Sequence, residues 1–118
     1  MKYDNLSLLL PYAESPEYGE KIAIIFSSLD YENCSKYFND LFSWIEDINT
    51  PGAMRIFEYL KMSPAELLYD EFKISAEASL KMRSKSLLNN LRIILFDNLE
   101  LQKMMKDKDP ILYSEFVI

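Results

Sequence analysis

A serine or threonine followed directly by proline occurs three times in this sequence, at Ser15-Pro16, Thr50-Pro51 and Ser63-Pro64. The hydroxyl group can accept hydrogen bonds from the free N–H groups at a helix start, and proline suits the first helical turn. Glu66 would complete a capping box after Ser63. Each pair therefore predicts a helix start, and the short connections between these helices favour antiparallel neighbours.

The spacing of apolar residues predicts five helices, with a short sixth one if Asn98 caps it rather than ends the fifth. Asp30 is the expected cap of the second helix, and Ile74-Ser75 marks a weak point in the fourth. The stretch before Ser15 has no clear period, and Ile111–Ile118 is an apolar tail expected to dock on the core. The apolar faces are Tyr18, Ile22, Ile25 and Leu29; Cys34, Tyr37, Phe38, Leu41, Ile45 and Ile48; Ala53, Ile56, Phe57 and Leu60; Leu68, Phe72, Ala76 and Leu80; Leu87, Leu88, Leu91, Ile94 and Leu95; and Met104 and Met105.

These patterns predict an all-α fold, an antiparallel helical array in one domain covering residues 1–118. A HEAT-like solenoid stub and a compact helical bundle are both compatible with them. A chain of 118 residues buries about two thirds of its unfolded surface, which suffices for a core without disulfides or metal. Only two glycines are present, which also favours helices over a sheet-rich fold.

The composition argues against an enzyme. The chain has no histidine, the commonest general base and zinc ligand, and Cys34 is its single cysteine. We therefore expect Cys34 to be a small buried hydrophobe, and we predict no catalytic residue, no metal site and no cofactor. The six methionines are expected to fill the core. No signal or membrane-spanning segment is apparent, so a cytoplasmic protein without a membrane partner is predicted.

The net charge of −6 is carried by one half of the chain. Residues 1–59 hold 10 acidic and 4 basic residues, whereas residues 60–118 hold 9 of each. An acidic surface repels phosphates, so we predict no nucleic-acid partner and favour a basic protein. Lys81, Arg83 and Lys85 form a small basic cluster, interpreted as a solvated face or a contact for an acidic partner.

The second predicted helix offers a candidate binding patch. At 100° per residue its solvent face carries Glu32, Lys36, Asn39, Ser43 and Glu46. Tyr37, Asp40, Trp44 and Asp47 fall on the flank between this face and the buried stripe. An aromatic ring beside two carboxylates suits an interface that receives lysine or arginine, with Glu46 at its edge. The alternative is that Trp44 packs against a neighbouring helix and Asp47 caps the next one.

A tight turn follows this helix, at Asn49, Thr50, Pro51 and Gly52. Proline cannot extend the second helix but suits the start of the third, where Asn49 or Thr50 would be the cap. Gly52 lowers helix stability, so its presence indicates a close approach of two backbones.

The stretch from Trp44 to Ala53, followed by Ile56, Phe57 and Leu60, resembles a W-x-x-D-x-N-x-P-G-A signature. That signature belongs to small helical domains among the predicted immunity proteins of bacterial polymorphic-toxin and contact-dependent inhibition systems. The resemblance covers roughly residues 30–62. It implies a cytoplasmic antitoxin that occludes one cognate toxin domain, commonly a nuclease. It transfers no inhibitory residue, because the toxin-facing residues of such domains vary. A small helical adaptor or regulatory protein-binding module is the alternative function, and the oligomeric state stays open.

Overall fold

The computed structural model describes the backbone of residues 2–117 and the side chains of residues 6–117. Within residues 2–117 every regular element is a helix, so the predicted all-α fold is confirmed. The elements in chain order are η1 (Lys2–Tyr12), α1 (Gly19–Ser27), α2 (Tyr31–Cys34), η2 (Ser35–Tyr37), α3 (Phe38–Trp44), α4 (Ala53–Lys61), α5 (Ala65–Met82), α6 (Lys85–Asp97), α7 (Leu99–Lys108) and α8 (Pro110–Val117).

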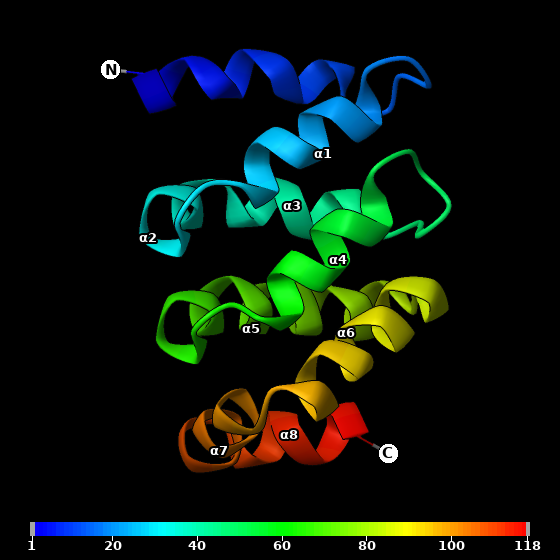
Figure 1. Ribbon diagram of the computed structural model, residues 1–118. Helices are drawn as coiled ribbons and strands as arrows, with labels where there is room; N and C mark the ends of the chain where they lie inside the picture. Colours follow the sequence, from blue (N-terminus) through cyan, green and yellow to red (C-terminus); the bar gives the residue numbers. More distant parts are fainter. Residues whose placement is uncertain (1, 118) are drawn as a thin grey trace.

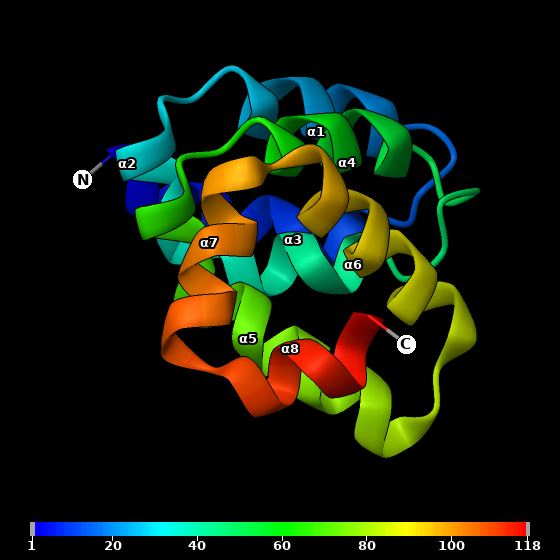
Figure 2. The ribbon, with the colours of Figure 1, turned by 90° about the horizontal axis from the view of Figure 1, so that it is seen from below.

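The helices stack along one axis in two layers. Figure 1 shows α1, α4 and α6 crossing the front of the stack, and α1 packs on α4 as α4 packs on α6. Behind them α3 packs on α5, which in turn contacts α7 and α8. Figure 2 shows the same arrangement after a quarter turn, with η1 and α3 on the far side of α1 and α4. The molecule is accordingly longer in one direction, with extents of 40 × 27 × 20 Å.

Aromatic side chains connect the rear layer from α3 to the C-terminus. The rings of Phe42, Phe72 and Phe116 meet edge to face, with centroids 6.2 and 5.8 Å apart along the row. All three side chains are buried. Edge-to-face aromatic pairs contribute about 0.5–1.5 kcal/mol beyond the burial of their area. The predicted docking of the apolar tail is therefore confirmed, because Phe116 reaches the core from α8.

Two of the caps predicted from the sequence are present in the structure, whereas a third cap and a predicted break are not. Asp30 accepts a hydrogen bond from the Asn33 N–H at 2.9 Å, and Asn98 accepts one from the Leu101 N–H at 3.1 Å. The prediction that Ser63 caps a helix is wrong. Its hydroxyl group is buried and donates back to the Tyr59 carbonyl at 3.0 Å. The weak point at Ile74-Ser75 does not break the helix, since α5 runs unbroken from Ala65 to Met82.

The two ends of the chain are more regular than their sequences indicate. The stretch without a clear period forms η1, and the apolar tail forms α8, which begins at Pro110. The expected second helix, by contrast, is divided into α2, η2 and α3, although its apolar stripe from Cys34 to Ile45 is buried as predicted.

Several apolar residues lie at the surface against expectation. Met54, Met62 and Met82 are 54%, 72% and 74% exposed, so the prediction that the methionines fill the core is wrong for them and holds for Met105. The helix predicted to start at Ser15-Pro16 begins at Gly19, so Ser15 is not its N-cap. The buried face of α1 is Gly19, Ile22, Ala23 and Phe26, which leaves Ile25, and Tyr18 just before the helix, exposed. Among the helices within residues 2–117, none has the length and hydropathy needed to cross a bilayer.

Candidate functional site: an acidic pocket beside a closed turn

Trp44 is buried against the turn that follows it and does not lie on an exposed flank of its helix. Its side chain is 7% exposed, and its ring meets Phe26 of α1 edge to face at 6.5 Å. The indole Nε1 donates a hydrogen bond across the connection to the Pro51 carbonyl at 3.0 Å. The structure therefore favours the packing alternative over an exposed aromatic contact, and the same holds for Tyr37, which is 5% exposed.

Gly52 makes the close backbone approach that the sequence indicated. Its φ of 80° lies in the left-handed region, which L side chains rarely adopt. A Cβ at this position would lie 2.7 Å from the Ala23 Cβ and 2.7 Å from the Gly19 carbonyl oxygen. The connection between α3 and α4 is thus pressed against α1, and only glycine fits there.

The start of α4 differs from the prediction. The helix begins at Ala53, and Gly52 supplies the carbonyl that accepts the first hydrogen bond, from the Ile56 N–H at 3.1 Å. Thr50 is therefore not the N-cap, and Pro51 does not occupy the first helical position. The Thr50 backbone belongs to the preceding turn, where its carbonyl accepts from the Ala53 N–H at 3.0 Å.

The acidic residue of the turn stabilises it locally. The Asp47 carboxylate accepts a hydrogen bond from the Asn49 N–H at 2.9 Å, two residues along the chain. This is an Asx turn rather than the helix cap expected for Asp47. Trp44, Asp47, Pro51 and Gly52 therefore have structural roles in one closed turn, which accounts for the residue types of the signature by packing and hydrogen bonding.

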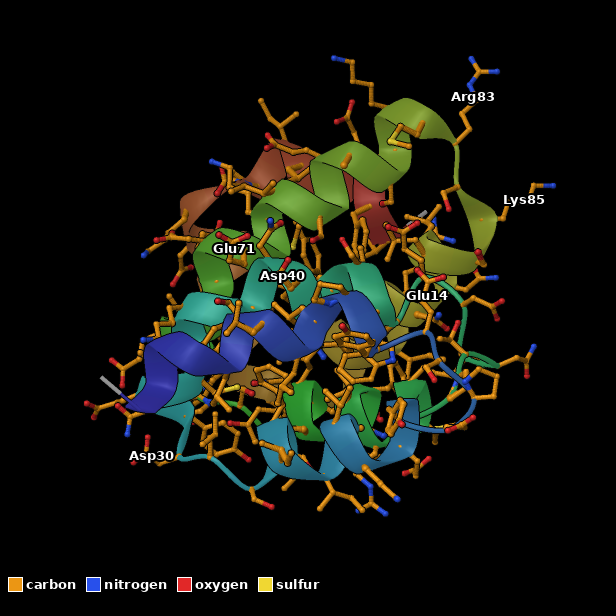
Figure 3. All side chains as sticks on the ribbon, turned by 90° about the horizontal axis from the view of Figure 1, so that it is seen from above. Glu14, Asp30, Asp40, Glu71, Arg83 and Lys85 are labelled. Carbon is orange, nitrogen blue, oxygen red and sulfur yellow. The ribbon has the colours of Figure 1, made fainter. Side chains whose placement is uncertain are left out.

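Beside this turn lies a pocket of about 420 Å³ between η1 and α3. We call it the acidic pocket; its lining comprises Leu10, Ala13, Glu14, Asp40, Ser43, Trp44, Glu46, Asp47 and Thr50. The four carboxylate residues in this lining are all exposed, and the lining contains no lysine or arginine. Figure 3 shows Glu14 and Asp40 on the side of the molecule where η1 crosses α3. Trp44 and Leu10 supply apolar wall to an otherwise charged site.

The acidic pocket suits an ammonium or guanidinium group. Four carboxylates around one hollow produce a negative potential that attracts cations and raises their local concentration. A lysine or arginine side chain also has an apolar stem, which can pack against apolar wall while its charged head meets the carboxylates. Among the residues described by the structure, no three acidic, cysteine or histidine side chains come close enough to hold a metal ion.

The structure brings together part of the predicted patch and adds a helix to it. Asp40, Glu46 and Asp47 share the acidic pocket, whereas Tyr37 does not line it. Sequence reasoning missed Leu10 and Glu14, which come from η1 and the residues after it. No local signal identifies them, because the stretch before Ser15 has no apolar period that would place one face against α3.

Cys34 is fully buried, as predicted. Burial raises the pKa of its thiol above the ordinary value, and Asp30 adds to that effect, while a hydrogen bond with Tyr59 acts in the opposite direction. The thiol faces the Phe26 carbonyl, with Sγ at 3.7 Å from the oxygen. A protonated thiol without solvent access behaves as a small hydrophobe.

No protein-family model, no curated protein and no solved structure matches this chain.

Proposed function

We propose that this protein is an immunity protein that binds a basic toxin domain through the acidic pocket and covers the toxin's active site. The observation that carries the proposal is the convergence of Glu14, Asp40, Glu46 and Asp47 around one hollow with no basic residue in its lining. The resemblance of residues 44–53 to the immunity-protein signature supports the same function, and it implies a cytoplasmic protein.

Inhibition follows from electrostatics in this proposal. A nuclease domain presents lysine and arginine residues to the phosphates of its substrate. The carboxylates of the acidic pocket would take the place of those phosphates and exclude the substrate. Attraction between oppositely charged surfaces accelerates encounter, which an inhibitor of a toxin needs, and like-charged surfaces are rejected. No turnover by this chain is required.

The product of the adjacent gene is the partner to test, by stopped-flow mixing and isothermal titration calorimetry. The test variant is Asp40→Lys with Glu46→Lys, two exposed carboxylates of the pocket. The matched control is Glu17→Lys with Glu32→Lys, which changes the net charge equally at exposed positions outside the pocket. Steered association depends on local charge, so the pocket variant should associate at least about tenfold more slowly, with a weaker salt dependence.

Equal losses in the two variants would show that only the net charge matters, and unchanged rates in the pocket variant would exclude the acidic pocket as the interface. Circular dichroism of each variant verifies that the helical fold is retained.

A specific observation favours the alternative function, a small helical adaptor. An apolar groove of about 420 Å³ lies between η1 and α1, lined by Leu9, Tyr12, Tyr18, Lys21, Ile22 and Ile25. Such a groove suits the apolar face of a short helix or tail. Tyr18→Ser with Ile25→Ser discriminates the two functions, because both side chains are exposed and their loss leaves the acidic pocket intact. An adaptor would lose its partner in this variant and retain it in Asp40→Lys with Glu46→Lys.

A further inference from the structure

A second hollow continues from the acidic pocket. This corner groove, of about 130 Å³, lies between α3, the second half of α5 and the start of α6. Ser43 and Glu46 line both the acidic pocket and the corner groove. On its other side the groove is lined by Ile74, Met82 and Ser84, among others. The surface is therefore continuous from Asp40 and Glu46 to the end of α5.

The charge on this surface changes sign across the corner groove. Arg83 and Lys85, which we call the basic corner, are exposed and flank the groove residue Ser84. Lys81, the third member of the predicted basic cluster, lines a different hollow, against α8. Figure 3 shows Arg83 and Lys85 pointing outward at the edge of the molecule, with Glu14 and Asp40 further in. Between the two charged regions, Ile74 and Met82 are 54% and 74% exposed. One face thus has an acidic end, an apolar middle and a basic end.

We propose that this face binds a second copy of the chain, in a two-fold symmetric dimer centred on the corner groove. The two-fold axis lies in the interface, passes through the apolar middle and runs at right angles to the line that joins the two charged ends. It therefore places the acidic pocket of each copy against the basic corner of the other. The Ile74 and Met82 side chains of the two copies would then cover one another. A partner of a single charge sign that covered the whole face would be repelled at one of its two ends. A second copy presents both signs in the required order.

This dimer does not depend on the immunity function, because its measurement involves no other protein. If both hold, the two complexes compete for Asp40 and Glu46. Binding of a toxin would then release the chain from its dimer.

The test uses two charge-reversed variants of the full chain. The acid-reversed variant is Asp40→Lys with Glu46→Lys, and the base-reversed variant is Arg83→Glu with Lys85→Glu. In the first, both ends of the face are positive, and in the second both are negative. Each variant alone should therefore lose self-association. Mixed in equal amounts, the two should form a heterodimer, because each positive end again meets a negative one. Misfolding of either variant cannot produce that recovery.

Sedimentation velocity from micromolar to millimolar concentration measures the mass of each sample. The wild-type chain should reach the mass of a dimer and no higher, each variant should stay a monomer, and the mixture should return to the dimer mass. The matched control, Lys103→Glu with Lys106→Glu on α7, changes the net charge as the base-reversed variant does and should dimerise like the wild type.

Three results would overturn the proposal. A wild-type chain that remains monomeric would leave the face to another protein, and growth beyond a dimer would indicate head-to-tail contacts. A mixture of the two variants that stays monomeric would exclude pairing of opposite ends.

Discussion

Two residues in the described part of the chain have a left-handed backbone, Gly52 with φ 80° and Arg83 with φ 55°. Gly52 precedes the first residue of α4 and is buried against α1. Arg83 follows the last residue of α5 and is exposed. The same local conformation is therefore adopted once by a residue without a side chain and once by a residue with a long charged side chain.

The difference lies in what surrounds the backbone. Behind Arg83 the Ser84 N–H donates to the Ser79 carbonyl at 3.1 Å, which closes the end of α5 in the manner of a Schellman motif. Its side chain extends into solvent, so only the local strain of the left-handed region opposes it. A side chain at position 52 would suffer the same local strain and would also collide with the backbone of α1. Packing between elements, rather than the dihedral angle alone, decides which residue is tolerated.

The largest effect is expected for Gly52→Ala. The left-handed conformation costs a residue with a Cβ about 1–2 kcal/mol, and overpacking adds about 1–3 kcal/mol. The new Cβ would lie 2.7 Å from a backbone oxygen of α1, which cannot move as a flexible side chain can. Urea unfolding followed by circular dichroism should show a large drop in midpoint or an unfolded protein.

Gly19→Ala separates the two contributions. A Cβ on Gly19 would lie 2.6 Å from the Ala13 carbonyl oxygen and 2.7 Å from the Pro51 Cβ, but the residue sits in regular helix. This variant should therefore show the packing loss without the left-handed strain. If Gly52→Ala is no more destabilising than a surface substitution, the close approach of the turn to α1 is not maintained in solution.

The sequence was sufficient to predict those features that depend on one helix at a time. Burial of Leu41, Ile56 and Leu91 follows from apolar spacing, and the cap at Asp30 follows from a side chain that reaches its own helix start. Ser63 departs from the rule because its hydroxyl group bonds to the Tyr59 carbonyl in the helix before it. Met62 is exposed because α4 ends there, at the surface.

The candidate site was predictable only in part, since it is made by two segments. Helical geometry places Asp40 on the accessible side of α3, and the same period continued past Trp44 puts Glu46 and Asp47 near it, although both residues follow the end of the helix. It does not show that η1 brings Glu14 to the same hollow, nor that Trp44 turns inward to the Pro51 carbonyl. Contacts between residues far apart in sequence determine both features, and helical periodicity carries no information about them.

The next prediction concerns Trp44, whose indole donates a hydrogen bond across the turn that contains Gly52. Trp44→Phe keeps an aromatic ring beside Phe26 but removes the hydrogen bond to the Pro51 carbonyl. Leaving a partly buried acceptor without its partner costs less than leaving a fully buried one, so the free energy of unfolding should fall by about 1–2 kcal/mol. Chemical denaturation followed by circular dichroism is suitable, because the variant lacks tryptophan fluorescence. An unchanged midpoint would mean that the bond contributes nothing to the turn.

At the other left-handed position a small gain is expected. Arg83→Gly removes the strain of a Cβ in this conformation, which is offset in part by the greater freedom of glycine in the unfolded chain. The net result should be an increase in stability of up to about 1 kcal/mol, measured by thermal unfolding. Arg83→Ala is the matched control, since it removes the charge and keeps the Cβ. A gain of equal size in Arg83→Ala would assign the effect to charge and not to backbone strain.

The smallest effect is expected at Thr50, the residue that the Thr-Pro pair marks as the start of α4. Because Gly52 starts that helix and no side chain caps it, Thr50→Ala should change stability by less than about 0.5 kcal/mol. Ser15→Ala provides the comparison. Ser15 is not the N-cap of α1, but its Oγ accepts from the Glu17 and Tyr18 N–H groups at 3.2 and 3.4 Å in the turn before that helix, and losing these bonds should cost about 1 kcal/mol. Parallel urea titrations of the two variants measure the difference. A larger loss at Thr50 than at Ser15 would show that the threonine hydroxyl group, and not the left-handed glycine, defines the start of α4.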